Sequence, residues 1–191
     1  MSTFKISDVR LIGRAVGGPQ KTASSVLNEA VRTQTTTKTY DIFLSHAFKD
    51  AELILGVKVK LETYGHSVYV DWLEDPQLDR SAVTPETAAK LRQRMTCCRS
   101  LFYSTTEASS NSKWMPWECG YVDGKRGRTA ILPLTETSME TYKGQEYLGI
   151  YPYVMEAPQE GETAKKLWVH YSPDTYCTFS AWLQGFEPSK H

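Results

Sequence analysis

The chain has 191 residues, of which 40% are hydrophobic and 23% charged, as in a globular protein with a substantial core. Basic and acidic residues both number 22, so the net charge is zero and the composition argues against a nucleic-acid-binding protein. No apolar run approaches the roughly 20 residues that cross a bilayer, and the N-terminal stretch lacks the apolar block of a secretory signal. We therefore expect neither membrane insertion nor secretion.

The four cysteines are an adjacent pair and two scattered residues, Cys97, Cys98, Cys119 and Cys177. This spacing matches neither a disulfide framework nor a zinc site. We expect free thiols, no metal site and a location in the reducing cytoplasm.

Residues 1–38 are predicted to form an N-terminal appendage, with a short helix in "TASSVLNEAVRTQ" and a polar linker in "TTTKT". From residue 39 to residue 191 the sequence alternates between strand-like and helix-like blocks. "YDIFLSH" reads as a strand, "AELILGVKVKLETYG" as a helix that ends at Gly65, and "HSVYVDW" as a second strand. "LEDPQLDRSAV" is predicted to be a polar loop.

The second half continues the alternation. Thr84 is predicted to cap a helix that begins at Pro85, and "CRSLFYST" to form a third strand. Ser112 is predicted to cap a helix that Gly124 ends, and "RTAILPL" to form a fourth strand. Further strands are expected around "YLGIYPYVM" and "KKLWVHY", followed by a closing helix with Ser172 as its cap and Pro173 as its first residue.

Such alternation predicts an α/β protein with a flavodoxin-like, mostly parallel sheet and helices on both faces. Ligands of these folds bind beyond the carboxyl ends of the strands. Three polar segments follow the first three strands and should meet at that edge: 45–50, 71–80 and 104–118.

The stretch "SKWMPWE" places Trp114 and Glu118 four residues apart, and hence on one face of a helix. Near the helix N-terminus a carboxylate is favoured, and an indole offers a flat wall for stacking. Together they can stabilise positive charge that develops on a sugar as a base departs. The plainer interpretation is that the tryptophans, Trp117 above all, pack against the sheet and the glutamate only complements the helix dipole.

Three motifs in order resemble the Toll/interleukin-receptor (TIR) family: "YDIFLSH", then "VYVDW" with its polar loop, then Ser-x-Trp-x-x-x-Glu, formed by Ser112, Trp114 and Glu118. The resemblance covers about residues 39 to 135. "EYLGIYPYV" and "KLWVHYS" further resemble bacterial stand-alone TIR proteins, including those of Thoeris anti-phage systems. Residues 39–191 would then be a TIR domain with a C-terminal strand–helix extension.

Catalytic TIR domains cleave the bond between nicotinamide and ribose in NAD, so the resemblance implies that NAD is a substrate and that no cofactor is needed. It implies a catalytic role for Glu118 and a place in the nicotinamide-ribose pocket for Trp114. It also implies that the loops after the first two strands line the NAD site, through Phe43, Ser45, His46, Phe48, Lys49, Asp71, Trp72 and Arg80.

The residues leave the acceptor open: water would give ADP-ribose, and a group of the same molecule would give a cyclic isomer. We rank cyclisation first, because a cyclic nucleotide suits a signal to a downstream effector in anti-phage defence. The resemblance also implies self-association through TIR loops.

Two other functions remain open at this point. A TIR interaction scaffold would bind partners without turnover. A nucleoside deoxyribosyltransferase-like enzyme would use its glutamate to form a covalent intermediate and would not consume NAD.

Overall fold

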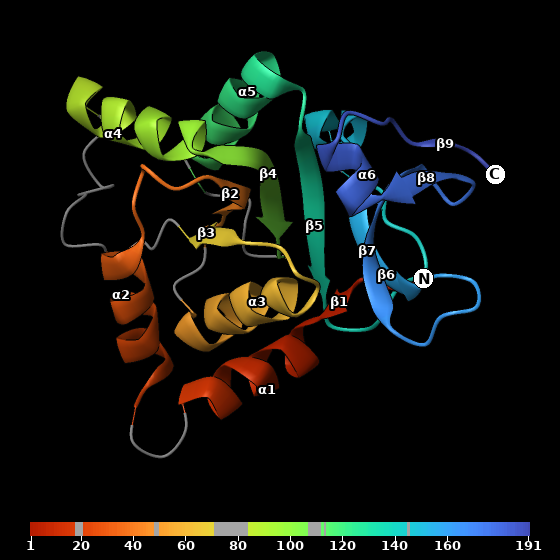
Figure 1. Cartoon of the computed structure of the whole chain (residues 1–191), viewed down its shortest axis with the longest axis horizontal. Coiled ribbons are helices and arrows are strands. Elements are labelled where there is room, and N and C mark those ends of the chain that lie inside the picture. The colour runs from red at the N-terminus through yellow and green to blue at the C-terminus, as the bar shows by residue number, and fades with distance from the viewer. Residues whose placement is uncertain (18–20, 48–49, 71–83, 107–111, 113, 145) are drawn as a thin grey trace.

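The computed structural model describes residues 1–17, 21–47, 50–70, 84–106, 112, 114–144 and 146–191. Within these residues the strands form one sheet of nine strands in the order β3-β2-β4-β5-β6-β7-β8-β9, with β1 paired to β5 (Figure 1). Strands β3 to β6 pair in parallel, and the last three pair antiparallel. The parallel strands are β3 (Val68–Val70), β2 (Tyr40–Ser45), β4 (Cys98–Thr105), β5 (Thr129–Thr135) and β6 (Tyr153–Pro158), and the others are β7 (Lys165–Ser172), β8 (Thr175–Thr178) and β9 (Ser189–Lys190).

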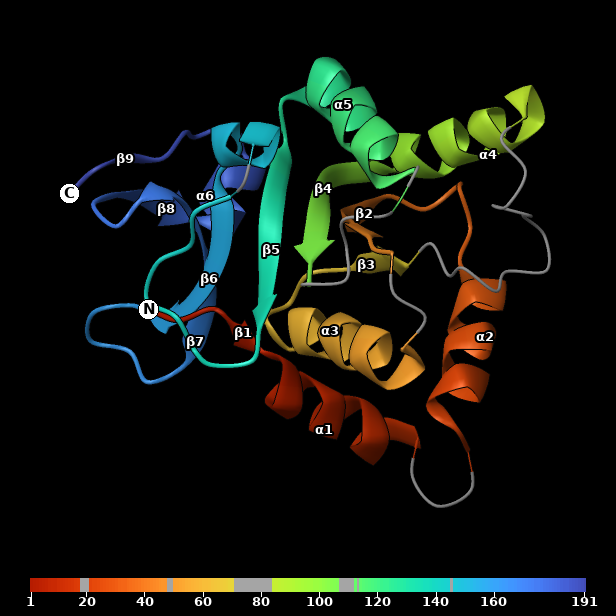
Figure 2. The same cartoon turned by 180° about the vertical axis from the view of Figure 1, so that it is seen from behind.

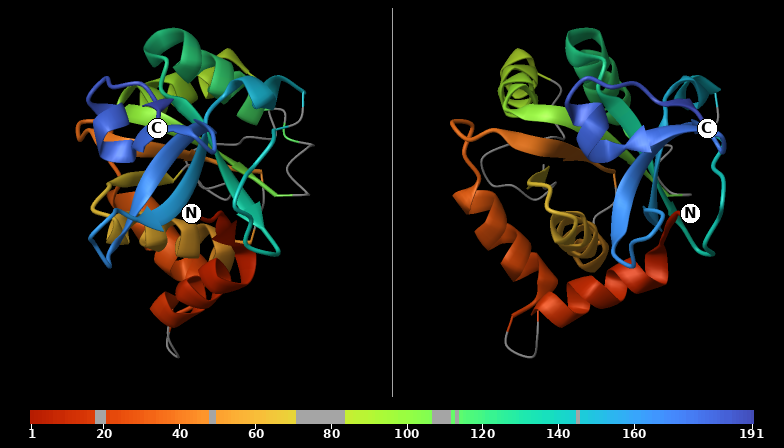
Figure 3. Two further views of the ribbon diagram at one scale, coloured as in Figure 1. Left: turned by 90° about the vertical axis from the view of Figure 1, so that its right-hand side faces the viewer. Right: turned by 45° about the vertical axis from the view of Figure 1, so that its right-hand side comes forward.

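Helices cover both faces of the parallel part of the sheet (Figure 3). Helix α3 (Ala51–Thr63), backed by α1 (Ile6–Gly17), covers one face, while α4 (Pro85–Thr96) and α5 (Met115–Arg126) cover the other. Helix α2 (Ala23–Thr33) flanks the β3 edge, and the short α6 (Phe179–Leu183) packs near β7. The predicted α/β class and mostly parallel sheet are therefore confirmed.

The fold has a hydrophobic core on each face of the sheet, and the alternation of side chains along β2 explains why. Ile42 and Leu44 join the core on the α3 side, whereas Phe43 joins the core beneath α4 and α5. Successive side chains of a strand point to opposite faces, so both faces of a central strand must be apolar.

Residues 1–38 pack closely on the rest of the fold: α1 lies along α3, and two further contacts reach the sheet. Strand β1 (Phe4–Lys5) pairs in parallel with β5, with Phe4 opposite Leu134 (Figure 2). The side chain of Gln34 accepts from the amide of Val70 and donates to its carbonyl, at 2.7 and 2.9 Å, and so pairs with the edge of β3. The boundary at residue 38 stays a prediction about domain organisation.

Several local predictions are confirmed. The Thr84 hydroxyl accepts from the amide of Thr87, Pro85 begins α4, and β4 covers "CRSLFYST". Glycine follows the end of α3, where the amide of Gly65 donates to the Glu62 carbonyl.

The predicted bounds of α5 are wrong by a few residues. The helix continues past Gly124 to Arg126, and Gly127 ends it because its backbone adopts the left-handed conformation with φ of 59°. The N-cap residue is Trp114, although the Ser112 hydroxyl does accept from the Met115 amide at 3.2 Å.

The prediction of a closing helix at Ser172 and Pro173 is also wrong. These residues lie at the turn between β7 and β8, and the helix begins six residues later at Phe179 with Thr178 as its cap. A Ser-Pro pair suits a tight turn as well as a helix start, so the local signal was ambiguous. The strand expected around "YLGIYPYVM" also starts late: residues Glu146–Ile150 form the 3-10 helix η2, and β6 begins at Tyr153.

Helices α1 and α3 cross in close contact, and each contributes one glycine to the crossing, Gly13 in α1 and Gly56 in α3. A Cβ atom on Gly56 would lie 1.9 Å from the carbonyl oxygen of Val9, and one on Gly13 equally close to the carbonyl oxygen of Glu52. Only residues without a side chain allow this backbone contact.

We therefore expect Gly56→Ala to lower the free energy of unfolding by about 3 kcal/mol, because the added methyl group forces the two helices apart. Gly124→Ala in α5 is the matched control, since its Cβ would meet no atom within 4 Å. That change should be neutral or stabilise by up to about 1 kcal/mol. Urea unfolding of both variants provides the measurement, and equal stabilities would contradict the close crossing.

Candidate functional site

The topology of the sheet places a switch point between β2 and β4. The chain leaves β2 toward α3 on one face, and it enters α5 on the opposite face after β4. These two strands are neighbours in the sheet, so their connections diverge at a topological switch point. Ligands of open α/β sheets bind at such points, outside the carboxyl ends of the strands.

A buried carboxylate lies at this point. Ser45, the last residue of β2, donates a hydrogen bond from its hydroxyl to Oε2 of Glu118 at 2.5 Å. Glu118 is fully buried, and only 1% of Ser45 is exposed. Burying a carboxylate costs free energy unless polar groups replace water, and the short bond from Ser45 supplies one of them.

Helix α5 sets the position and favours the charge of this carboxylate. Glu118 occupies the first turn of the helix, where the unpaired amides create partial positive charge. Its own amide donates to the carbonyl of Trp114 at 2.8 Å, so the side chain projects from a regular helical turn. The site thus rests on a strand end and a helix start rather than on loops alone.

Two groups beside Glu118 are held neutral. Burial raises the pKa of the Cys119 thiol to about 11, and the nearby carboxylates of Asp123 and Glu118 add to the shift. Burial also raises the pKa of Tyr103, which lies opposite Ser45 in the sheet. Cys119 is therefore a thiol rather than a thiolate nucleophile near neutral pH.

Trp114 is more buried than an open stacking platform would be. It packs edge-on against Trp117 with ring centroids 5.6 Å apart, and 8% of its surface is exposed. Trp117 in turn stacks on Tyr121, as part of the hydrophobic layer over the sheet. A role for Trp114 in the nicotinamide-ribose pocket stays a prediction.

The other residues predicted to line the NAD site divide into three groups. Phe43 is fully buried and stacks on Tyr69, on the same sheet face as Ser45. His46 follows Ser45 and is 1% exposed. The remaining predicted NAD contacts lie outside the described residues: Phe48, Lys49, Asp71, Trp72 and Arg80.

Sequence reasoning named Ser45 and Glu118 separately but missed their bond, because 73 residues separate them. It also missed Tyr103. Tyr103 lies opposite Ser45 only because of the register in which β2 pairs with β4, and the sequence alone does not give that register.

The described residues also bear on metal binding and membrane insertion. They contain no group of three or more histidine, cysteine, aspartate or glutamate side chains placed to hold a metal ion. None of the helices they form combines the length and apolar character needed to cross a membrane. All four cysteines are free thiols, as the sequence predicted.

Comparison with known proteins identifies the family. No protein-family model matches the chain. A protein of Bacillus cereus (strain MSX-D12) named "Probable 3' cyclic ADP-D-ribose synthase ThsB'" is 50% identical over 163 residues, which cover 85% of this chain and 84% of the relative. The chain belongs to the ThsB' family.

Membership of the ThsB' family confirms the predicted resemblance to TIR proteins of the Thoeris type. A second relative, "Putative cyclic ADP-D-ribose synthase TIR2" of Cytobacillus dafuensis, is 31% identical over 85 residues. That match covers 44% of this chain and 22% of the relative, so the similarity extends to less than half of this chain.

Proposed function

We propose that the chain is an NAD-consuming TIR enzyme that releases nicotinamide and makes a cyclic ADP-D-ribose as a signal in Thoeris anti-phage defence. The observation that carries this proposal is the buried Glu118 carboxylate, held by Ser45 at the switch point of the sheet. The name of the Bacillus cereus relative supports the cyclic product and favours a 3' linkage.

The proposed reaction requires electrostatic stabilisation from the protein but no general acid. The bond between ribose C1 and the nicotinamide nitrogen breaks, and its electron pair neutralises the pyridinium, so no general acid is required. Positive charge then develops on the ribose. A carboxylate fixed beside this charge before reaction stabilises the transition state more than it stabilises the substrate.

The second half of the reaction determines the product. A hydroxyl of the same molecule attacks C1 and loses its proton, which closes the ring without adding water. Attack by water would give linear ADP-ribose instead. A buried site favours the internal acceptor because it limits the access of solvent.

Incubation of the purified chain with NAD tests this proposal. We expect equal amounts of nicotinamide and of a cyclic product lighter than ADP-ribose by one water molecule, separated by chromatography and identified by mass spectrometry. Specific activity should rise with protein concentration if the chain works as an assembly through its TIR loops.

Other outcomes would favour the alternatives. Intact NAD at high protein concentration would favour an interaction scaffold. A glycosyl-enzyme trapped with a nucleoside substrate would favour a deoxyribosyltransferase-like enzyme. ADP-ribose as the main product would favour hydrolysis over cyclisation.

A further inference from the structure

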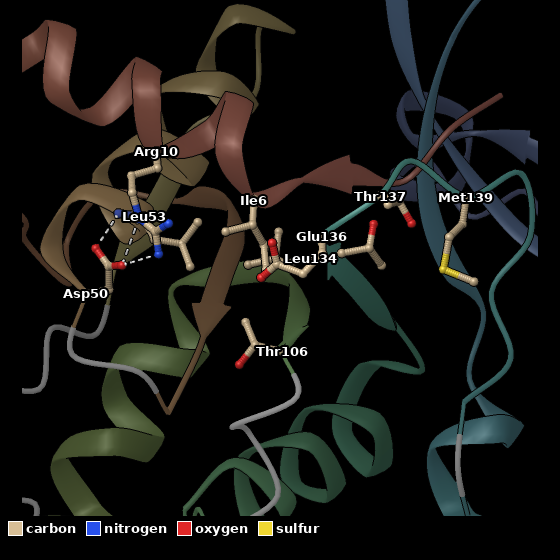
Figure 4. A pocket seen from close by; sticks show the side chains of 10 residues that line it. Ile6, Arg10, Asp50, Leu53, Thr106, Leu134, Glu136, Thr137 and Met139 are labelled. Atoms are coloured by element: carbon tan, nitrogen blue, oxygen red, sulfur yellow. Dashed lines mark hydrogen bonds and ion pairs between the residues drawn. The ribbon is translucent and has the colours of Figure 1, made fainter.

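A cavity separate from the Ser45–Glu118 pair lies at the carboxyl edge of the sheet, on the α3 side of the switch point (Figure 4). Its volume is about 430 Å³, and α1, the start of α3 and the ends of β4 and β5 line it. Arg10 and Asp50 approach it from one end, and Met139 lies at the other (Figure 4). Its lining contains neither Ser45 nor Glu118, and none of the residues of the Ser-x-Trp-x-x-x-Glu motif.

The cavity and the buried carboxylate lie along the same strand end. Ser45, which binds Glu118, is opposite Tyr103 in the sheet. Thr106, which lines the cavity, directly follows β4, the strand that pairs with β2 at this same carboxyl edge. A dinucleotide has two nucleosides joined by a diphosphate, so one molecule laid across this edge can reach both places.

The walls of the cavity fit a nucleoside. Buried apolar side chains of Ile6, Leu53 and Leu134 form one side, and the flexible thioether of Met139 adjoins them. Hydroxyls of Thr106 and Thr137 supply donors and acceptors among these apolar groups. Ligand sites for bases and sugars typically combine apolar walls with a few polar groups.

The charges of the cavity favour neutral groups over phosphate. Two carboxylates, those of Asp50 and Glu136, line it together with one guanidinium. That guanidinium, of Arg10, already donates two hydrogen bonds to Oδ2 of Asp50, at 2.7 and 3.1 Å. The remaining carboxylate charge repels phosphate and accepts hydrogen bonds from hydroxyl or amino groups.

We propose that this cavity binds the adenosine half of NAD while the nicotinamide half lies at Glu118. This inference rests on the proposed function, and it names the place of the half-substrate that does not react. Residues 6 and 10 of α1 then belong to the substrate site. Cyclisation then requires the dinucleotide to fold so that a hydroxyl of the adenosine ribose meets C1 of the reacting ribose.

Filling the cavity tests the proposal. Thr137 is exposed at the cavity, so Thr137→Trp should place an indole in it without disturbing the core. We expect the KM for NAD to rise at least ~10-fold with a smaller change in kcat, because substrate binding is impaired and Glu118 is untouched. Ser138→Trp is the matched control, since the neighbouring residue is also exposed and does not line the cavity.

A binding measurement separates this proposal from the proposed function. Adenosine alone, followed by ligand-observed NMR, should bind the wild-type chain and Ser138→Trp, and at least ~10-fold more weakly to Thr137→Trp. If NAD is not turned over but adenosine binds in this pattern, the cavity proposal stands and the enzymatic one fails. If NAD is turned over and Thr137→Trp changes neither KM nor adenosine binding, the cavity proposal is wrong.

Discussion

Replacement of Glu118 by glutamine is expected to lower the rate of nicotinamide release from NAD by about 10³-fold. Glutamine has the same shape and can still accept a hydrogen bond from Ser45, so the packing of the site persists while the negative charge is lost. Loss of one preorganised electrostatic contact to a transition state typically costs 10² to 10³ in rate, and here the full charge facing the ribose disappears. Single-turnover release of nicotinamide, followed by chromatography, provides the measurement.

Glu86→Gln is the matched control for this experiment. Glu86 also occupies the first turn of a helix, α4, but it is exposed. Backbone and side-chain hydrogen bonds at the helix start lower the pKa of its carboxyl, so it too is a helix-stabilised carboxylate. The control should retain wild-type activity, whereas equal losses in both variants would mean that Glu118 acts only through the stability of its helix.

Removal of Glu156 is expected to cause a large loss of stability. Only 6% of Glu156 is exposed, and the ammonium groups of Lys60 and Lys165 lie 2.9 and 3.0 Å from its carboxylate. The hydroxyl of Tyr64 donates a further bond. In Glu156→Ala, the largely buried Lys60 loses this partner, and breaking such a pair typically costs 3–5 kcal/mol.

Urea unfolding of Glu156→Ala and of Glu162→Ala measures this difference. Glu162 pairs with Lys166 at 2.8 Å, but both side chains are about two-fifths exposed. An exposed pair contributes roughly 0–1 kcal/mol, so this control should unfold close to the wild type. Similar losses in the two variants would show that the buried network does not stabilise the fold.

The same network predicts how stability depends on pH. Burial pushes the pKa of Glu156 upward, but hydrogen bonds from Tyr64 and Lys60 outweigh it and hold the pKa below the ordinary value of 4.5. A carboxyl group with a lowered folded-state pKa stabilises the protein above its unfolded pKa. The difference between wild type and Glu156→Ala should therefore be full above about pH 5 and shrink as the pH falls through the folded pKa.

The sequence predicted those parts of the fold that depend on neighbouring residues. A threonine cap followed by proline is a local signal for the start of a helix, and Thr84 with Pro85 begins α4 here. The bounds of β4 followed from a run of apolar residues between a helix end and a polar loop. At Ser172 the same local rules failed, because the pairing of β7 with β8 took precedence over a helix start.

The contacts that complete the candidate site depend on distant residues. Ser45 and Glu118 each carried a recognisable motif, so both could be named, but their bond required the register of β2 and the placement of α5. Arg10 and Glu136 belong to no motif. They meet at the cavity beside α1 because β1 pairs with β5, which brings α1 across the end of the sheet.

The pairing of β1 with β5 has a consequence for synthesis on the ribosome. Thr3 and Thr135 share a hydrogen bond of 2.7 Å across 132 residues of chain. At roughly 5–20 residues per second, the first strand waits on the order of ten seconds or more before its partner has been made. Until then β1 has no strand to pair with, whereas α1 can pack on α3 as soon as residue 63 has left the ribosome.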